Sequence, residues 1–525
     1  MKCKIDHLIY PLLVSTTIGC NCEKQTPGIK KPNVILILAD DLGFSDIGCY
    51  GSEIPTPNLD ALAQKGIRFT QAYNCGVCFP SRAALLTGAY PHQVGMIEAP
   101  GEIKNAVTLG HLFRMAGYST LWSGKHHGTQ NPVDLGFDEY DGLRDGCCNY
   151  FNPGVQRPGE GKPAKKVEYR TWIKDGVLLQ PYTPGDSCFY TTDYFTNSAI
   201  GWLDEYGKKD KPFFLYLAYT APHDPLQAPA EEIQKYLGKY MAGYEKIRNA
   251  RFLKQKQNGL LGEEYPLSQA EHRDWDTLSE NEKLREDSTM AVYAAMINRL
   301  DKNIGRVISK LEELGQAKNT VILFASDNGA AHQVVTVPDS GPIGSMTRWK
   351  SLGPEWANVA NTPLRKSKVY SYEGGIRTPF IVCWPSGIKN KGRVDNTPVH
   401  FIDLLPTFAD ITEVAPPGTF NNKPVISPQG ISILPLFKNK KINRKNPLYH
   451  QLRSGKALRY ENWKLVSWKK QGQSVAQWEL YNMDKDPVEM HDQIDAYPEV
   501  AKDLAGKYDE WFKQVSPQKA ETSEL

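Results

Sequence analysis

Short apolar runs that end in polar or charged residues recur along the chain. They cover residues 33–39, 120–122, 213–219 and 321–325. Their length and their content of β-branched residues favour parallel strands that are buried on both faces of a sheet. Residues 379–383 are a further strand candidate. The pattern therefore predicts several buried strands spread over most of the sequence.

Amphipathic patterns lie between these strand candidates. From Val292 to Leu314 the apolar residues recur at helical spacing, and Gly315 follows as a C-cap. Alternation of buried strands with amphipathic helices predicts an α/β fold, with a large, mostly parallel sheet flanked by helices. The stretch 230–286 is charged and rich in Lys and Glu, so we interpret it as a helical insertion on the surface.

The last part of the chain has a different pattern. After a loop at 438–441, residues 457–466 and 478–481 predict strands of a small antiparallel sheet. Apolar spacing over 500–512 predicts a helix packed on that sheet. We therefore expect the chain to divide into an export signal (1–20), a main α/β domain (30–440) and a small C-terminal α+β subdomain (446–525).

The N-terminus has the pattern of an export signal. Lys2 and Lys4 precede an apolar stretch from Leu8 to Ile18, which is typical of a signal that is removed. The run Thr17-Ile18-Gly19-Cys20 resembles a bacterial lipoprotein cleavage box with Cys20 as the lipidated residue; ordinary secretion with cleavage nearby is the alternative. We expect a bacterial protein exported to the periplasm or held at the outer membrane, with membrane contact only through a lipid anchor at Cys20.

Composition narrows the classes of protein further. The 525 residues are enough for one large domain and a smaller one. Lys and Arg number 62 and Asp and Glu 59, for a formal net charge of +3, which gives no argument for a nucleic-acid partner. No internal apolar run reaches the roughly 18 residues of a membrane span. The ten cysteines show no regular disulfide or zinc spacing, so we interpret most of them as buried or half-buried thiols.

Charged or ligand-type side chains follow four of the apolar runs. In parallel α/β sheets, ligands bind at the carboxyl ends of the strands, so these side chains predict one shared site. Two of the strand ends together offer three carboxylates and one amide oxygen, hard ligands that suit Ca²⁺ or Mg²⁺ rather than zinc. The number of charged ligands favours Ca²⁺. The residues at the four strand ends are Asp40-Asp41, Lys125, His223 and Asp327-Asn328.

The most specific motif is the run Cys78-Phe79-Pro80-Ser81-Arg82, followed by Leu86-Thr87-Gly88. It fits C-x-P-S-R-x-x-x-L-T-G, the signature that directs oxidation of the cysteine to Cα-formylglycine in type I sulfatases. The hydrate of this aldehyde carries two geminal hydroxyls: one can attack sulfur, and the other can later lose its proton and expel the sulfate. Pro80 predicts a helix start, which places Cys78 just before a helix N-terminus, where N–H groups favour anions.

With its other motifs the chain resembles a type I, formylglycine-dependent sulfatase of the alkaline phosphatase superfamily, close to bacterial arylsulfatases. The resemblance covers nearly everything after residue 30 and implies hydrolysis of sulfate esters. Besides the cysteine run, the motifs that carry it are Ala39-Asp40-Asp41-Leu42-Gly43, Gly124-Lys125-His126-His127, Ala221-Pro222-His223, Ser326-Asp327-Asn328-Gly329 and Lys368 ahead of Glu373-Gly374-Gly375.

The resemblance implies a metal centre with one Ca²⁺ per chain. Its ligands are the strand-end oxygens and the formylglycine, at positions Asp40, Asp41, Cys78, Asp327 and Asn328. The implied partners are a sulfate ester, such as a sulfated carbohydrate or an aryl sulfate, and the enzyme that generates formylglycine.

Five other residues receive roles in the chemistry from the same resemblance. Arg82 and Lys125 are expected to hold the formylglycine hydrate, and His127 to take its proton when sulfate is eliminated. His223 and Lys368 are expected to bind the sulfate oxygens. Because His is the natural general acid near neutral pH, we assign protonation of the leaving alcohol to His223.

One segment departs from the family pattern. Residues 124–129 read Gly-Lys-His-His-Gly-Thr, where the family often has Gly-Lys-Trp-His-Leu-Gly. The Lys and the second His keep their places, but His126 and Gly128 change the packing beside the site. His332 lies four residues after Asn328, and both a substrate contact and an exposed loop position fit it.

Two other functions stay open from the sequence. One is a phosphonate or phosphodiester hydrolase of the same superfamily, some of which also use formylglycine. The other is a surface protein that binds sulfated glycans without catalysis. Sulfatase-like motifs along the full length argue against the first. The intact set of ten positions argues against the second, because a binding protein does not need the nucleophile.

Overall fold

The predicted strand at residues 33–39 is β1 (Asn33–Asp40), and it lies inside a large sheet. The structure is a computed structural model that describes residues 30–163, 168–335, 337, 340–469 and 476–516. The other strands of this sheet are β2 (Ile67–Tyr73), β3 (Ser119–Gly124), β4 (Glu139–Leu143), β5 (Trp172–Lys174), β6 (Val177–Leu179), β7 (Phe213–Pro222), β8 (Thr320–Ser326), β9 (Arg377–Cys383), β10 (Arg393–Asp395) and β11 (Val399–His400).

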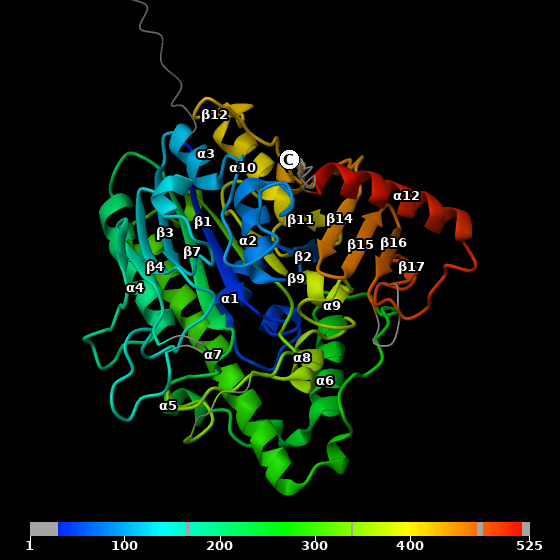
Figure 1. Cartoon of the computed structure of the whole chain (residues 1–525), viewed down its shortest axis with the longest axis horizontal. Coiled ribbons are helices and arrows are strands. Elements are labelled where there is room, and N and C mark those ends of the chain that lie inside the picture. Colours follow the sequence, from blue (N-terminus) through cyan, green and yellow to red (C-terminus); the bar gives the residue numbers. More distant parts are fainter. Residues whose placement is uncertain (1–29, 164–167, 336, 338–339, 470–475, 517–525) are drawn as a thin grey trace, which may run out of the picture. The chain divides into compact units, whose positions relative to one another are not determined.

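The strand order places β1 between β7 and β8. It runs β10-β2-β9-β8-β1-β7-β3-β4-β5-β6, with β11 paired to β2. Figure 1 shows β1 beside β7, with β3 and β4 beyond it. β1 is parallel to both of its neighbours, and β3 is parallel to β7. The sheet is therefore mostly parallel, as predicted, although β9 runs antiparallel to both β2 and β8. As a result, the carboxyl ends of β1, β3, β7 and β8 lie at one edge.

Helices cover both faces of the sheet. Alternate residues of β1 contribute to two hydrophobic clusters, because successive side chains of a strand point to opposite faces. One cluster includes buried residues of α1 (Pro57–Gln64), α4 (Thr191–Tyr206) and α7 (Glu280–Glu313). The other includes buried residues of α2 (Cys78–Thr87), α3 (Leu109–Met115) and α10 (Leu404–Thr412).

Helix α7 is longer than its apolar pattern predicts. It begins after Ser279, whose hydroxyl accepts from the N–H of Glu282, while the Glu282 carboxylate accepts from the N–H of Ser279. This capping box satisfies two helix-end donors. The apolar spacing starts later because most residues of the first turns face solvent.

The stretch 230–286 is only partly helical: α5 (Ala230–Ile233), α6 (Tyr244–Gln257) and the start of α7 lie in it, whereas residues 258–274 form no helix. It is not simply a surface insertion, because α6 buries polar side chains against the loop after β1. The fully buried side chain of Arg251 lies 2.7 Å from Asp46 and 2.8 Å from Glu53. A buried ion pair leaves no apolar signature in the sequence, which explains the misinterpretation.

The C-terminal sheet is antiparallel, in the order β14 (Leu448–Leu452), β15 (Gly455–Tyr460), β16 (Trp463–Ser467) and β17 (Trp478–Asn482). The predicted strand 457–466 is a hairpin of β15 and β16. The helix α12 (Pro498–Val515) packs on this sheet (Figure 1). Besides several 3-10 helices, the short elements are α8 (Pro354–Ala360), α9 (Glu373–Ile376), α11 (Leu434–Phe437), β12 (Thr419–Phe420) and β13 (Lys423–Pro424).

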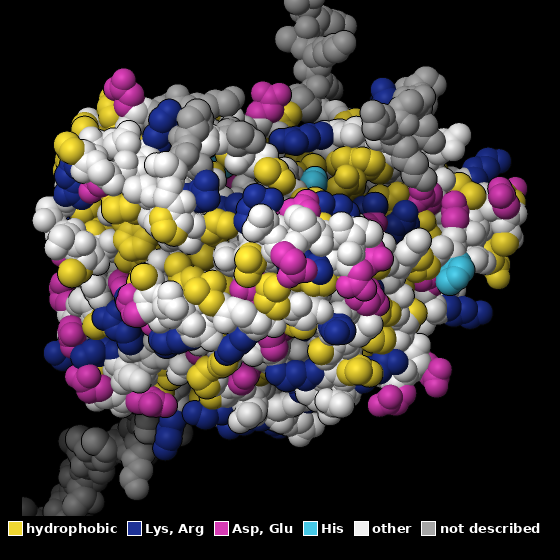
Figure 2. All heavy atoms as spheres, turned by 90° about the horizontal axis from the view of Figure 1, so that it is seen from below, with side chains coloured by type: hydrophobic (Ala, Val, Ile, Leu, Met, Phe, Trp, Pro, Cys, Tyr) yellow, Lys and Arg dark blue, Asp and Glu magenta, His cyan; other side chains and the backbone are white. Residues whose placement is uncertain are grey.

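Several expectations concern the surface and the ends of the chain. The described cysteines are free thiols, buried or half-buried except for the exposed Cys188. Figure 2 shows basic and acidic side chains interspersed over one face. Within the described part of the chain, no helix combines the length and hydropathy needed to cross a membrane. The expected export signal and the cysteine at position 20 lie outside the described residues.

Candidate active site and metal centre

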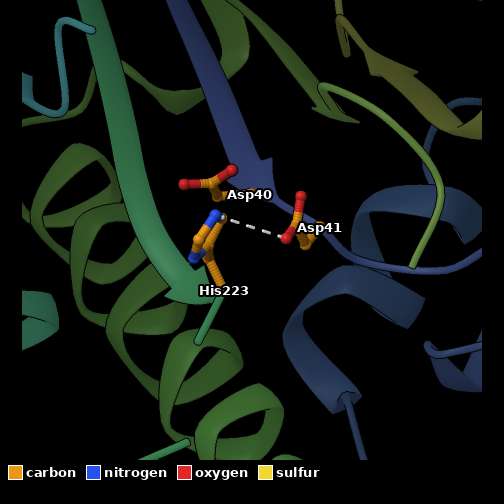
Figure 3. A group of neighbouring side chains, drawn as sticks. All are labelled: Asp40, Asp41 and His223. Carbon is orange, nitrogen blue, oxygen red and sulfur yellow. Dashed lines mark ion pairs between the residues drawn. The ribbon is translucent and has the colours of Figure 1, made fainter. Parts of the chain in front are cut away.

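The residues predicted to share a site meet at the carboxyl edge of the main sheet. One ligand atom each of Asp40, Cys78 and Asp327 lie within 4.8 Å of one another. Asp40, Asp41 and His223 form a second such group, which Figure 3 shows at the ends of β1 and β7. Because β1, β7 and β8 are parallel, residues far apart in the sequence come together here.

Two basic side chains pair with the carboxylates nearest to Cys78. Lys125 Nζ lies 2.5 Å from Asp40 Oδ2, and Arg82 Nη2 lies 2.7 Å from Asp327 Oδ2. All four side chains are buried. Burial, together with the negative charge of Asp40, raises the pKa of Asp327 to about 6. The two carboxylates repel each other, so an additional cation between them is electrostatically favourable.

Asp41 has a different set of partners. Lys368 Nζ lies 2.6 Å from its Oδ1, and the amide of Asn328 donates to the same oxygen at 2.6 Å. His223 Nε2 lies 3.5 Å from Oδ2 (Figure 3). Burial opposes ionisation, but the positive charges of His223 and Lys368 hold the pKa of Asp41 below its ordinary value. Asp41 is therefore a carboxylate.

The oxygen atoms of the site fit a hard divalent cation. Asp40 Oδ1, Asp41 Oδ2 and Asn328 Oδ1 are buried and accept no hydrogen bond from the described residues, although Asp41 Oδ2 lies 3.5 Å from Nε2 of His223. Buried polar atoms without partners cost free energy. Three such oxygens on neighbouring strand ends are the donor set that Ca²⁺ or Mg²⁺ takes. The residues present can thus hold a metal ion.

Cys78 is the first residue of α2, because the helix begins two residues before Pro80, where the sequence predicts its start. Val77 is the N-cap, and Cys78 is 3% exposed. Its Sγ lies 3.1 Å from Nδ1 of His127. The first-turn N–H groups of a helix have no intrahelical partner, so this end of the ten-residue α2 favours a negatively charged group.

The two histidines of the site have opposite electrostatic surroundings. Burial and the positive charges of Lys125 and Arg82 lower the pKa of His127 well below its ordinary value. Burial also opposes protonation of His223, but the negative charges of Asp41, Asp40 and Asp224 together raise the pKa of His223 well above its ordinary value. A neutral imidazole next to Cys78 and a protonated one next to Asp41 suit a base and an acid.

The departure at residues 126 and 128 has a packing explanation. His126 is buried, its Nε2 lies 2.9 Å from the carbonyl oxygen of Gln130, and its ring packs edge-on against Trp122 at 4.9 Å. A Cβ atom at Gly128 would lie 2.7 Å from Cε1 of His126. The two departures therefore go together: the imidazole occupies the space that a larger side chain at 128 would need.

His332 is half-buried rather than fully exposed. Its Nδ1 lies 2.9 Å from the hydroxyl of Ser367, the residue before Lys368. Its ring centroid lies 5.2 Å from that of Tyr370, which lies 4.5 Å from the ring of Trp468. A role in substrate contact stays a prediction.

Two polar residues near the site were missed by the sequence analysis. Asp224 Oδ1 lies 2.9 Å from Nδ1 of His223, and the Ser351 hydroxyl donates to Asp224 Oδ2 at 2.6 Å. The position of Asp224, directly after His223, is a signal that could have identified it. Ser351 is 127 residues further along the chain and has no motif around it, so only the fold reveals its position.

The chain matches two known family models. A model described as "Sulfatase" matches residues 32–414. A second, described as "N-sulphoglucosamine sulphohydrolase, C-terminal", matches residues 366–514.

Individual proteins are similar over most of the chain. An uncharacterized sulfatase of Schizosaccharomyces pombe is 34% identical over 519 residues, which is 90% of this chain and 92% of that protein. The arylsulfatase of Klebsiella aerogenes is 34% identical over 437 residues, 77% of this chain and 91% of that enzyme. The crystal structure of Ps i-CgsB in complex with k-i-k-neocarrahexaose has a TM-score of 0.68 at 28% identity and covers 93% of this chain and 94% of that one.

Proposed function

The chain belongs to the sulfatase family, and we propose that it hydrolyses sulfate esters with a formylglycine formed from Cys78 as the nucleophile. One observation carries the proposal. Cys78 Sγ lies 3.1 Å from His127, and within 4.8 Å of ligand atoms of Asp40 and Asp327. A structural thiol does not need buried carboxylates and a buried imidazole around it, whereas a nucleophile does.

We further propose that the metal is Ca²⁺, one per chain. Its ligands come from the ends of β1 and β8 and the start of α2, and the unpartnered buried oxygens support this assignment. When bound, the cation offsets the negative charge that develops on the sulfuryl oxygens. The number of carboxylates favours Ca²⁺ over Mg²⁺. The proposed ligands are Asp40, Asp41, Asp327, Asn328 and the oxygen of residue 78.

The basic residues around Cys78 prepare the nucleophile in this proposal. Formylglycine supplies a geminal diol, with one hydroxyl for attack on sulfur and one for the later release of sulfate. Lys125 and Arg82 hold that diol while they neutralise Asp40 and Asp327. His127, kept neutral by its surroundings, accepts the proton from the second hydroxyl through Nδ1, the atom that faces residue 78.

The other side of the site binds and protonates the substrate. Lys368 Nζ lies 2.6 Å from Oδ1 of Asp41, and His223 Nε2 lies 3.5 Å from Oδ2. These contacts with a proposed metal ligand support a role for both cationic groups in binding the sulfate oxygens. The protonated His223 donates its Nε2 proton to the oxygen of the leaving alcohol as the S–O bond breaks. Lys368 remains charged and stabilises the sulfuryl group.

For the substrate we propose a sulfated carbohydrate, with aryl sulfates as a second class. The support is the similarity to Ps i-CgsB, whose crystal structure is a complex with k-i-k-neocarrahexaose, and to the arylsulfatase of Klebsiella aerogenes. We also propose that the protein is exported to the periplasm or the outer membrane and is matured by a formylglycine-generating enzyme. In this proposal, residues 30–440 form the catalytic domain, and residues 446–525 form a subdomain that stabilises it.

The proposal is tested on protein produced together with a formylglycine-generating enzyme. The assays measure sulfate release from 4-nitrophenyl sulfate and from a panel of monosaccharide sulfates, and phosphate or phosphonate release from matched esters. We expect sulfate release that Cys78→Ala abolishes and that the control Cys188→Ala, an exposed thiol, leaves unchanged. Faster turnover of the phosphorus esters, or binding of sulfated sugars without release, overturns it.

A further inference from the structure

Hydrogen bonds fix the backbone of His223. Its N–H donates to the carbonyl oxygen of Thr220 at 3.0 Å. The Tyr150 hydroxyl lies 2.7 Å from the carbonyl oxygen of Thr220 and 2.9 Å from that of His223, so its single hydrogen is shared between these two oxygens. The imidazole ring is connected to this fixed backbone through two rotatable bonds. Its direction therefore depends on the partners of the ring itself.

The two ring nitrogens face different surroundings. Nδ1 lies 2.9 Å from Oδ1 of Asp224 and 2.7 Å from the backbone carbonyl oxygen of the same residue. Nε2 points the other way and lies 3.5 Å from Oδ2 of Asp41, inside the site (Figure 3). The contacts at Nδ1 thus decide which nitrogen reaches the substrate.

Asp224 is itself held by a directed chain of hydrogen bonds. The N–H of Val335 donates to Ser351 Oγ at 3.0 Å, and the Ser351 hydroxyl donates to Asp224 Oδ2 at 2.6 Å. Ser351 therefore uses its single hydrogen on Asp224. An ionised carboxylate only accepts hydrogen bonds, so the hydrogen between Asp224 and the ring belongs to Nδ1 of His223.

The loop that carries Ser351 is anchored beside His223. The N–H of Leu226 donates to the carbonyl oxygen of Lys350 at 2.7 Å, and the N–H of Ala228 donates to that of Gly344 at 3.1 Å. The side chains of Asp224 and His223 are 12% and 15% exposed. The chain from Val335 to the ring is therefore largely shielded from competing water.

We propose that Asp224, held by Ser351, is a positioning residue that turns Nε2 of His223 toward the leaving oxygen of the substrate. The inference rests on the proposed function, in which His223 is the general acid. As the S–O bond breaks, the Nε2 proton moves to the leaving oxygen and the alcohol departs. The ring is left neutral with its hydrogen on Nδ1, still bonded to Asp224, and Nε2 regains a proton from water.

The first test compares leaving groups. An activated aryl alcohol hardly needs an acid, whereas a sugar alcohol does, so a misoriented acid affects only the second. Asp224→Ala should lower kcat for a monosaccharide sulfate by roughly 10- to 100-fold with little change in KM, but by less than about 3-fold for 4-nitrophenyl sulfate. The backbone carbonyl remains as a partner for Nδ1, so the loss should be smaller than in His223→Ala.

Matched variants separate positioning from general damage. Asp224→Asn keeps an acceptor oxygen and should recover most of the sugar-sulfate activity. Ser351→Ala should show a weaker form of the same leaving-group pattern. The double variant that combines Asp224→Ala with His223→Ala should be no slower than His223→Ala alone. Both substitutions impair the same function, protonation of the leaving oxygen, so their effects should not add. The exposed Asp210 provides a control, Asp210→Ala, with wild-type kinetics.

Three results would overturn the proposal. The first is an equal loss of kcat on both substrates, and the second is no recovery of activity in Asp224→Asn. The third is a double variant whose loss of kcat equals the product of the two single losses. If the wild-type enzyme releases no sulfate, the proposed function has failed, and a crystal structure of Asp224→Ala still tests the positioning. We expect its His223 ring to occupy more than one orientation, because only the backbone carbonyl oxygen of residue 224 still holds Nδ1. A single ring orientation that directs Nε2 toward Asp41, as in the wild type, contradicts the role of Asp224.

Discussion

Lys464, on β16 of the C-terminal sheet, forms a buried ion pair with Glu373 at the start of α9, with 2.8 Å between Nζ and Oε1. The same ammonium group lies 2.6 Å from Oε1 of Glu489. Burial raises the pKa of Glu489 to about 7, with Lys464 acting in the opposite direction. Glu373 is five residues after Lys368. The ion pair therefore connects the C-terminal sheet to the segment that carries this proposed substrate-binding lysine.

Replacing Lys464 with Met should destabilise the protein, because it leaves two acidic groups buried without their shared cation. Removing one partner of a buried ion pair typically costs about 3 kcal/mol or more. We expect a clearly lower midpoint of thermal unfolding. Lys485→Met, at an exposed position, is the control and should leave the midpoint unchanged. A Lys464→Met protein as stable as the wild type would show that the ion pair of Lys464 with Glu373 does not stabilise this segment.

Two buried histidines should make the free energy of unfolding depend on pH. They are His400, on β11 of the main sheet, and His450, on β14 of the C-terminal sheet. Burial, with the charge of Lys464, lowers the pKa of His450 to about 3, and burial with the charge of Arg444 lowers that of His400 to about 3. His400 Nδ1 accepts a hydrogen bond from the N–H of Ile402 at 3.1 Å, which requires an unprotonated nitrogen.

The direction of the pH effect follows from the pKa of histidine in the unfolded chain. This pKa is about 6.5 and lies above the pKa of both histidines in the folded protein. The unfolded chain binds these protons more tightly, so the stability is complete above about pH 6.5 and is lost as the pH falls toward 3. His450→Gln should therefore reduce the fall in the unfolding midpoint between about pH 7.5 and about pH 5. His491→Gln, at a side chain that is 79% exposed, should leave the fall unchanged. If the unfolding midpoint of His450→Gln falls as much as that of the wild type, His450 does not contribute to the pH dependence of stability.

The elements that could be predicted from the sequence are those with an apolar signature. β1, β7 and β8 are buried on both faces, and their apolar runs identified them and the polar residues at their ends. Arg251 shows the limit: its partner Asp46 is distant in sequence, and a buried ion pair looks like a surface pattern. Ser351 shows the same limit at the site, because its hydrogen bond to Asp224 depends on how two loops fold.

Metal content gives an independent test of the site. Asp40, Asp41, Asp327 and Asn328 come from two strand ends, and elemental analysis should find about one Ca²⁺ per chain. Asp327→Asn should lower this stoichiometry, whereas Asp210→Asn should not. Chelation should abolish activity, and added Ca²⁺ should restore it. Stoichiometric zinc, or full Ca²⁺ content in Asp327→Asn, would require a different set of ligands.

The role of His127 can be separated from that of His223. If His127 accepts a proton during release of sulfate, its loss should slow turnover by roughly 100-fold or more, whichever alcohol leaves. His127→Ala incubated with substrate should then accumulate sulfate on residue 78, detectable as added mass. His126→Ala, next to it in sequence but packed against Trp122, should not trap an adduct. Equal activity of His127→Ala and wild type, or no trapped mass, removes His127 from this step.

The proposed mechanism requires residue 78 to work as an aldehyde and not as the thiol that the gene encodes. The most direct measurement is peptide mass spectrometry of the segment around residue 78, combined with trapping of carbonyl groups and with the activity of the same preparations. We expect the modified peptide to lack the thiol and to react as an aldehyde, and its amount to rise in proportion to sulfate release across preparations of differing maturation. Full activity in a preparation whose Cys78 is entirely unmodified would contradict the proposed mechanism.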